Sequence, residues 1–285
     1  MGLFFSSDRF TRPGPGVRPD APRKKGVARL AEIMGRDMWN FFRAGFLAFL
    51  GCLPFIIGMF FAVETHALLF MLLAGIIGGL IAGPELSAMA DTVLRSLRDE
   101  PGYWWETYRR VWKRNARESL VPGMLTGLVL SMQIFTLFHM SVISAGIVTW
   151  VLLILSFVVT LGLESYIWPQ IALLDLPLYG ILKNSLLLFL GYLPRSLGAI
   201  AIKAVYWGAI LLFFPLTTII LPFTNFWLPM LPALLCIYQP LNKCFTIEST
   251  INKMREDELN AALAKDNEEE YYRRKGRNSE KHFAN

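Results

Sequence analysis

The chain has few residues of the kinds that metal binding and redox chemistry require. It contains three cysteines and three histidines among 285 residues. No two cysteines have the spacing of a metal site or a redox motif. Cys52 and Cys236 fall within apolar stretches and Cys244 follows one, so all three are expected to be thiols used for packing. The sequence therefore predicts no metal and no cofactor.

The motifs of common enzyme classes are also missing. No G-x-x-x-x-G-K-[ST] phosphate loop occurs, which argues against an ATPase subunit. Neither H-E-x-x-H nor G-x-S-x-G occurs, so the signatures of zinc peptidases and serine hydrolases are absent. We therefore expect a protein that is not an enzyme and has no catalytic residues.

Charge is scarce and apolar residues are abundant. Charged residues make up 18% of the chain and hydrophobic residues 54%, and the mean hydropathy is +0.43. These values are typical of a membrane protein that crosses the bilayer several times. In a soluble protein the net charge of +6 would suggest nucleic acid. Here the basic residues flank apolar stretches, so the expected partner is a bilayer with anionic headgroups and not nucleic acid.

Six stretches are long and apolar enough to cross about 30 Å of hydrocarbon, which takes about 20 residues. The predicted fold is an all-α, polytopic membrane protein with six transmembrane helices. The stretches lie at 42–63, 67–88, 120–140, 143–167, 197–220 and 224–242.

Aromatic and basic residues recur just before the first, third and fifth stretches. Such segments are found at 36–50, 110–123 and 190–203. This recurrence suggests three hairpin units, each preceded by a cytoplasmic interfacial amphipathic helix, although the bias toward basic cytoplasmic loops alone would also place basic residues there.

The distribution of lysine and arginine predicts the orientation. Nine lie in residues 1–45, seven in 89–119 and nine in 243–285, whereas the connections near 64–66, 139–143 and 219–226 have none. Because basic loops stay in the cytoplasm, both termini are expected there. Residues 1–34 are expected to be a flexible basic arm without a signal peptide, and 35–248 the six-span domain. The remaining segment, 249–285, is expected to be a polar tail, helical to about 265 and then disordered.

The segment 103–120 is amphipathic when it is placed on a helix. Trp104, Tyr108, Val111 and Trp112 share one face, and basic residues cover the other. The helix is expected to lie flat in the interface, either against lipid or as a cytoplasmic docking element, and the sequence leaves both readings open. The candidate interfacial or docking residues are Trp104, Trp105, Tyr108, Arg109, Arg110, Trp112, Lys113, Arg114 and Asn115.

Three ionisable residues within the predicted spans are candidate intramembrane polar groups, namely Glu85, Glu164 and Lys203. Both glutamates are expected near cytoplasmic ends of spans, where one of them could pair with Lys203 or Arg195. Lys203 is expected to extend its side chain to the cytoplasmic face. None is expected at the middle of the bilayer, which weakens the argument for a pump.

One long block resembles a known family. The residues "GPELSAMADTVLRSLRDEPGYWWETYRRVWKRNARESLVPG" (83–123) are similar to the signature region of the YesL-like family of bacterial membrane proteins. "GCLP" (51–54) and "LKNSLLLFLGYLPRSL" (182–197) are similar to that family too, and the resemblance covers about 35–245. It implies a multi-pass protein of the bacterial plasma membrane, associated with a carbohydrate (oligosaccharide) ABC importer. The family supplies no catalytic residues.

Two functions follow as hypotheses. The chain lacks the E-A-A-x-x-x-G loop of permeases, so it does not resemble the permease itself. The first hypothesis is therefore a non-catalytic accessory or scaffold subunit, which could contact the importer's permease subunits. The second is an independent small-solute transporter or channel. A water-filled cavity lined by Glu85 or Glu164 would favour transport, and a closed apolar bundle would favour the scaffold. The oligomeric state stays open.

Overall fold

A computed structural model describes residues 23–100, 102–142, 146–254, 256–257, 260–261 and 263–264. In this part of the chain the regular structure is helical and no strand occurs, so the all-α prediction is confirmed. Six of the described helices are long and apolar enough to cross a membrane, which confirms the polytopic class. The elements are α2 (Gly26–Thr65), α3 (Leu68–Leu73), η1 (Ala74–Gly78), α4 (Gly79–Arg98), α5 (Trp104–Phe138), α6 (Ile147–Leu173), α7 (Leu178–Gly191), α8 (Leu193–Leu212), η2 (Leu216–Thr218), α9 (Leu221–Thr224) and α10 (Trp227–Phe245).

Several helices continue well past the apolar stretches. The 40 residues of α2 extend about 60 Å at 1.5 Å per residue, twice the thickness of the hydrocarbon layer. The structure therefore differs from the expected separate interfacial helices. Segment 36–50 lies inside α2 and segment 110–123 inside α5, each continuous with its span. Segment 190–203 covers the junction of α7 and α8.

The predicted boundaries also shift at the ends of the chain. Helix α2 begins at Gly26, within the segment assigned to the flexible arm, and residues 1–22 lie outside the described part. The expected helix of the tail is present over 247–254, and the end of the tail from 265 lies outside the described residues. The connection between the predicted stretches 143–167 and 197–220 contains the end of α6, all of α7 and the start of α8.

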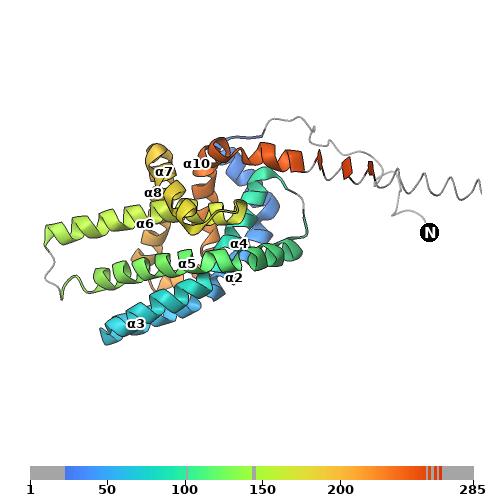
Figure 1. Cartoon of the computed structure of the whole chain (residues 1–285). Helices are drawn as coiled ribbons and strands as arrows, with labels where there is room; N and C mark the ends of the chain where they lie inside the picture. Colours follow the sequence, from blue (N-terminus) through green and yellow to red (C-terminus); the bar gives the residue numbers. More distant parts are fainter. Residues whose placement is uncertain are drawn as a thin grey trace, which may run out of the picture.

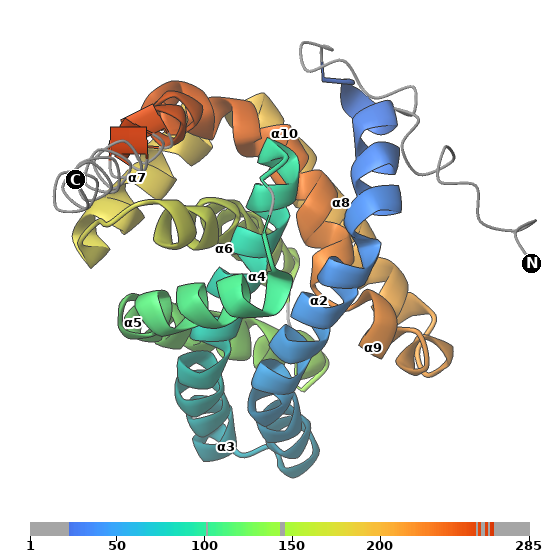
Figure 2. The same cartoon turned by 90° about the vertical axis from the view of Figure 1, so that its right-hand side faces the viewer.

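The helices do not form a bundle of parallel rods. Helices α5 and α6 run side by side, whereas α8 and α10 cross them at a steep angle (Figure 1). The view turned by 90° shows the first turns of α5 running across α4 instead of along it (Figure 2). At the far ends of α2 and α5, the ring nitrogens His66 Nδ1 and His139 Nε2 lie 2.7 Å apart. This contact joins the α2–α3 and α5–α6 connections.

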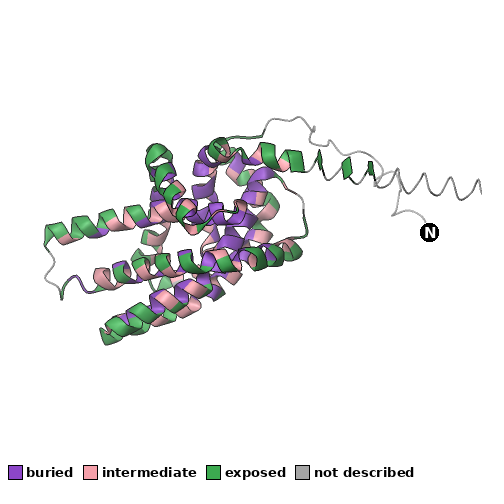
Figure 3. Ribbon diagram, in the orientation of Figure 1, coloured by how far each residue is buried: buried purple, intermediate pink, exposed green. Residues whose placement is uncertain are grey.

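Two regions of the fold are packed differently. Large buried side chains from α2, α4, α6 and α10 form one core, which we call the side-chain core and which includes Phe41, Tyr166, Trp168 and Leu231. The outer parts of α2, α3, α5 and α6, which we call the projecting half, carry exposed apolar side chains (Figure 3).

Glycines hold the projecting half together along η1, α4 and α5. A Cβ atom added at Gly79 would lie 2.2 Å from the carbonyl oxygen of Gly123, and one at Gly127 would lie 2.5 Å from that of Gly75. We call this contact, with Gly83 opposite Gly123, the glycine seam. Helices in lipid gain little from burying apolar side chains, so close backbone contact between small residues is what favours their association.

Candidate functional site

The carboxylate of Glu85 in α4 is held by two aromatic residues of α5. The Tyr108 hydroxyl donates to Oε2 at 2.5 Å, and Nε1–H of Trp112 donates to Oε1 at 2.9 Å. Tyr108 and Trp112 are four residues apart and so lie on the same face of the helix. Gly51 of α2 packs against the same carboxylate side chain, because a Cβ there would lie 2.6 Å from Glu85 Cγ. We call this arrangement the Glu85 clasp.

The aromatic face of α5 therefore packs mainly on protein. Tyr108 is buried, and the half-buried Trp104 ring lies 5.3 Å from the Tyr108 ring. The guanidinium of Arg43 sits between Trp104 and Trp39, 5.6 Å and 5.3 Å from the two ring centroids. Trp105 is 54% exposed and remains available to lipid or a partner. Of these rings, only that of Trp105, at the edge of the face, is exposed enough for the expected contact with lipid.

Asn115 and Arg114 anchor the middle of this segment. Asn115 is buried, as its position on the apolar face predicts, and its Oδ1 accepts from Arg114 Nε at 3.0 Å. Its Nδ2 has no hydrogen-bond partner in the described part of the chain. Arg114 also donates from Nη2 to the carbonyl of Ala172 at 2.8 Å, at the end of α6. Arg114 is therefore a structural tie between α5 and α6.

Four other basic residues of α5 face outward. Arg109, Arg110, Lys113 and Arg117 are exposed, and we call them the basic ridge. Arg110 approaches Glu106 at 3.9 Å, but both side chains are more than 70% exposed, so this pair contributes little. The ridge is the part of the sequence-predicted site that is free to contact something else.

Asp99 gathers a cluster of arginines that the sequence did not single out. It ends α4 with a φ of 60° and accepts from Arg29 at 2.7 Å, while Arg36 contacts its other oxygen. Arg23 lies 3.1 Å from the same carboxylate. Partial burial by itself raises the pKa of Asp99, but the hydrogen bonds from Arg36 and Arg29 outweigh it and leave the pKa below its usual value.

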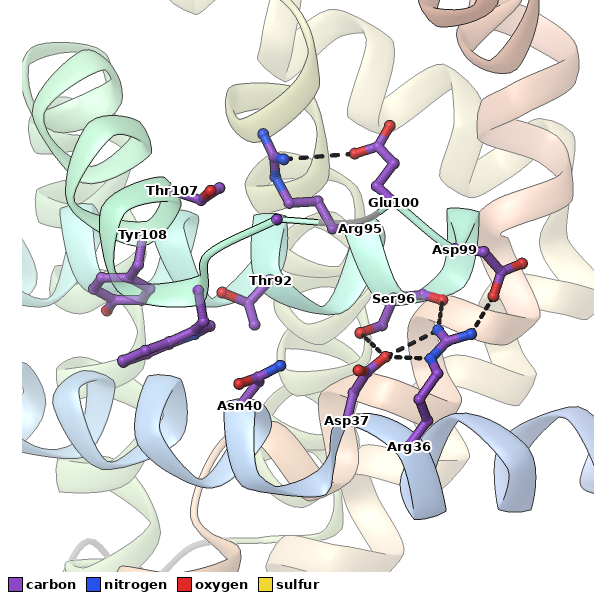
Figure 4. A pocket seen from close by; sticks show the side chains of 12 residues that line it. Arg36, Asp37, Asn40, Thr92, Arg95, Ser96, Asp99, Glu100, Thr107 and Tyr108 are labelled. Carbon is purple, nitrogen blue, oxygen red and sulfur yellow. Dashed lines mark hydrogen bonds and ion pairs between the residues drawn. The ribbon is translucent and has the colours of Figure 1, made fainter. Parts of the chain in front are cut away.

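A polar pocket of about 360 Å³ lies between the start of α2, the end of α4 and the start of α5. Figure 4 shows Asp37 and Asn40 from α2 facing Thr92 and Ser96 from α4. Ser96 donates to Asp37 Oδ2 at 2.7 Å. The other residues that line the pocket are Arg36, Arg95, Asp99, Glu100, Gly102, Trp104, Thr107 and Tyr108. Neither Glu85 nor Glu164 lines this pocket, so it does not supply the cavity that would favour transport.

The remaining intramembrane groups meet between α6 and α8. Lys203 is buried halfway along α8, and its Nζ donates to the hydroxyl of Ser165 at 2.9 Å. Its side chain is therefore buried against α6 and not extended away from the helices as expected. Glu164 interacts electrostatically with Lys203, yet within the described residues the two form no ion pair within 4.0 Å. The pairing suggested for the two charges is thus an attraction at longer range.

Known proteins offer no further guide. No family model matches the chain, and no curated protein or solved structure matches it. The resemblance to the YesL-like family therefore stays a hypothesis, and the geometry of the chain has to carry the functional argument.

The sequence analysis did not reveal two contacts. It gave Asp99 no role, although the arginines Arg23, Arg29 and Arg36 near the start of α2 are a basic cluster that needs an acidic partner. The contact between His66 and His139 joins residues 73 positions apart, and no local pattern reveals it.

Proposed function

We propose that the chain is a non-catalytic accessory or scaffold subunit of a bacterial plasma membrane, with both termini in the cytoplasm. The observation that carries the proposal is a contrast within α5. Its inward-facing groups are tied to other helices, whereas the four cations of the basic ridge point outward without a strong partner. Such a surface is suited to contact with another molecule.

The ridge stands on a rigid support. Tyr108 and Trp112 bind Glu85 of α4, and Arg114 binds the end of α6, so the first turns of α5 are fixed at three points. A surface that is already ordered loses less conformational entropy on association. Its charges complement an acidic protein surface or lipid phosphates, and such charges mainly govern the rate and specificity of association.

The resemblance to the YesL-like family supplies the partner in this proposal, a carbohydrate ABC importer. The chain has neither the phosphate loop of the motor nor the coupling loop of a permease. Its part would be to pack beside the permease subunits and to contact them through its spans and the basic ridge. It would add no ATP hydrolysis of its own.

A small-solute transporter is the second candidate, and one observation favours it. Half-buried Glu164 and buried Lys203 place an acid and a base inside helices that are apolar enough to cross a membrane, and Lys203 binds Ser165. Ionisable groups in such positions often mark a substrate or ion pathway. Lys203→Met should abolish solute flux in liposomes if this candidate holds.

The decisive experiment compares two sets of charge removals. The triple variant Arg109→Gln, Arg110→Gln, Lys113→Gln removes most of the ridge. A matched control, Lys183→Gln, Arg195→Gln, Lys243→Gln, removes three other exposed cations. We expect the first set to reduce co-purification of permease subunits at unchanged protein level, and the control to leave it unchanged.

Equal co-purification with both sets would contradict the proposed role of the ridge. Solute flux by the purified protein alone, lost in Lys203→Met, would favour the transporter.

A further inference from the structure

The bend between α8 and α10 contacts α2 near Phe41 and Gly45. A connection on the outer surface would instead lie near the other end of the apolar part of α2, at Thr65. The ring of Trp227 stacks on Phe41 at 5.9 Å, and Phe223 stacks on Phe42 at 5.8 Å. Asn225 sits so close to Gly45 that a Cβ there would lie 2.3 Å from its Oδ1. All three contacts fall at the beginning of the apolar part of α2.

The opposite end of that apolar part is about one bilayer away. From Gly45 to Thr65, α2 continues for 20 residues, which corresponds to about 30 Å of helix. The hydrocarbon layer is about 30 Å thick. The end at Thr65 is also where His66 meets His139, so the α2–α3 and α5–α6 connections share one level. The bend near Asn225 lies at the other level.

The surface of the bend is suited to acyl chains and not to water. No charged residue occurs in the whole of 204–242. The bend also exposes large apolar side chains, each more than half accessible: Phe213, Phe214, Leu216, Ile219, Ile220 and Phe223. In contrast, the connections at the far level include Glu64, His66, His139 and Ser141. A bend this apolar would be costly to expose at an aqueous surface.

Three side-chain donors at the bend bond to carbonyl groups of the bend and of the adjoining end of α8. Thr217 Oγ1 donates to the carbonyl of Ile210 at 2.7 Å, and Asn225 Nδ2 donates to that of Pro222 at 3.0 Å. Trp227 donates from Nε1 to the carbonyl of Phe223 at 2.8 Å. Pro215 and Pro222 have no N–H group to satisfy. Each unsatisfied polar group is costly in lipid, so these internal hydrogen bonds lower the cost of placing the bend at the edge of the hydrocarbon layer.

We propose that α8, η2, α9 and α10 form a re-entrant hairpin, with residues 213–223 among the acyl chains of the leaflet nearer the chain termini. The hairpin enters and leaves on one side, so α2, α3–α4, α5 and α6 make the four complete crossings. Exposed Arg195 and Lys243 stand near its two ends, where headgroup phosphates would meet them. Four crossings keep both termini on one side, as the six-span topology also does.

Labelling of single cysteines tests this placement. In a variant whose three native cysteines are replaced by alanine, Ile219→Cys probes the bend and Ser141→Cys probes the α5–α6 connection. Both side chains are exposed, so neither change disturbs packing. We expect a membrane-impermeant maleimide added outside intact cells to label position 141 and to leave position 219 unlabelled.

A fluorophore at position 219 supplies the second readout, with Phe214→Cys as an independent site. We expect its emission to be quenched by lipids that carry a nitroxide on the acyl chain, more strongly than emission from position 141. Labelling of position 219 as fast as position 141 would overturn the proposal. Absence of external labelling at both positions would overturn it too, because the argument requires residue 141 at the far surface.

Discussion

The two ends of α2 pack in opposite ways. Toward Gly26 the helix buries Ile33 and Phe41 among large side chains of α4 and α10. Toward Thr65 it exposes Phe60 and Phe61, and its buried contacts are a smaller cluster around Met59 and Met71 together with the close approach of Gly58 to Ala74. One helix therefore belongs to a side-chain core at one end and to the projecting half at the other.

The two ends are stabilised by different kinds of contact. Large side chains that pack against one another stabilise the side-chain core by apolar burial and dispersion. Acyl chains are as apolar as leucine, so wherever a helix faces lipid, close backbone packing between small residues is what favours association. The charged clusters around Asp99 and the clasped start of α5 lie beside the side-chain core. The candidate docking surface thus belongs to the region that side-chain packing makes rigid.

The largest expected effect distinguishes the two ends of α2 directly. Phe41→Ala should destabilise the protein by about 3–5 kcal/mol, because it leaves a cavity in a core where Phe41 is fully buried. Phe60→Ala, on the same helix at a site that is 62% exposed, should change stability little. Thermal unfolding of both variants in the same lipid nanodiscs checks this, and equal losses would remove the distinction between the regions.

A smaller effect tests the Glu85 clasp. Tyr108→Phe removes one donor from the Glu85 carboxylate and should cost about 1.5–3 kcal/mol, the range for hydrogen bonds to charged groups. Tyr103→Phe is the control, since Tyr103 is 85% exposed. Combining Tyr108→Phe with Glu85→Gln should cost less than the sum of the single changes. Additive losses, measured by chemical unfolding, would show that the two residues are not coupled.

The smallest effect concerns pH at Asp99. Because the arginines lower its pKa, the ionised form stabilises the folded state above the ordinary pKa of about 3.9, and that contribution is lost as the pH falls further. Asp99 is one-third exposed, so the effect should stay within about 1 kcal/mol. Below about pH 4, the stability of the Asp99→Asn variant should vary less with pH than the stability of wild type. Glu106→Gln, an exposed control, should follow wild type.

Hydropathy and positive charge were enough to predict the fold class and the approximate spans. The predicted stretch 42–63 lies within α2 and 120–140 coincides with the second half of α5. The same measure could not detect that α2 starts as early as Gly26, because the first part of the helix is less apolar and packs against α4 and α10. Hydropathy likewise has no information about contacts between distant segments, such as that between Asn225 and Gly45.

For the candidate site, the sequence predicted which face of the helix is buried but not which residues its side chains bind. Helical periodicity placed Tyr108 and Asn115 on the inward face, and both are buried. It could not predict that Glu85, 23 residues earlier, accepts the Tyr108 hydroxyl, because such a bond depends on how two helices cross. Lys203 shows the same limit. Its short distance from the predicted end of a span suggested an extended side chain, whereas Ser165 of a neighbouring helix binds it.

The most direct test of the account is the same small change at two glycines. Alanine usually stabilises a helix by up to about 1 kcal/mol relative to glycine. At Gly208, where nothing lies within 4 Å, Gly208→Ala should raise the unfolding temperature or leave it unchanged. At Gly79 the new methyl group would lie 2.2 Å from the Gly123 carbonyl oxygen, so Gly79→Ala should push α4 and α5 apart and cost about 1–3 kcal/mol. We expect opposite signs in the same nanodiscs, and equal stabilisation at both positions would contradict the close backbone packing of the glycine seam.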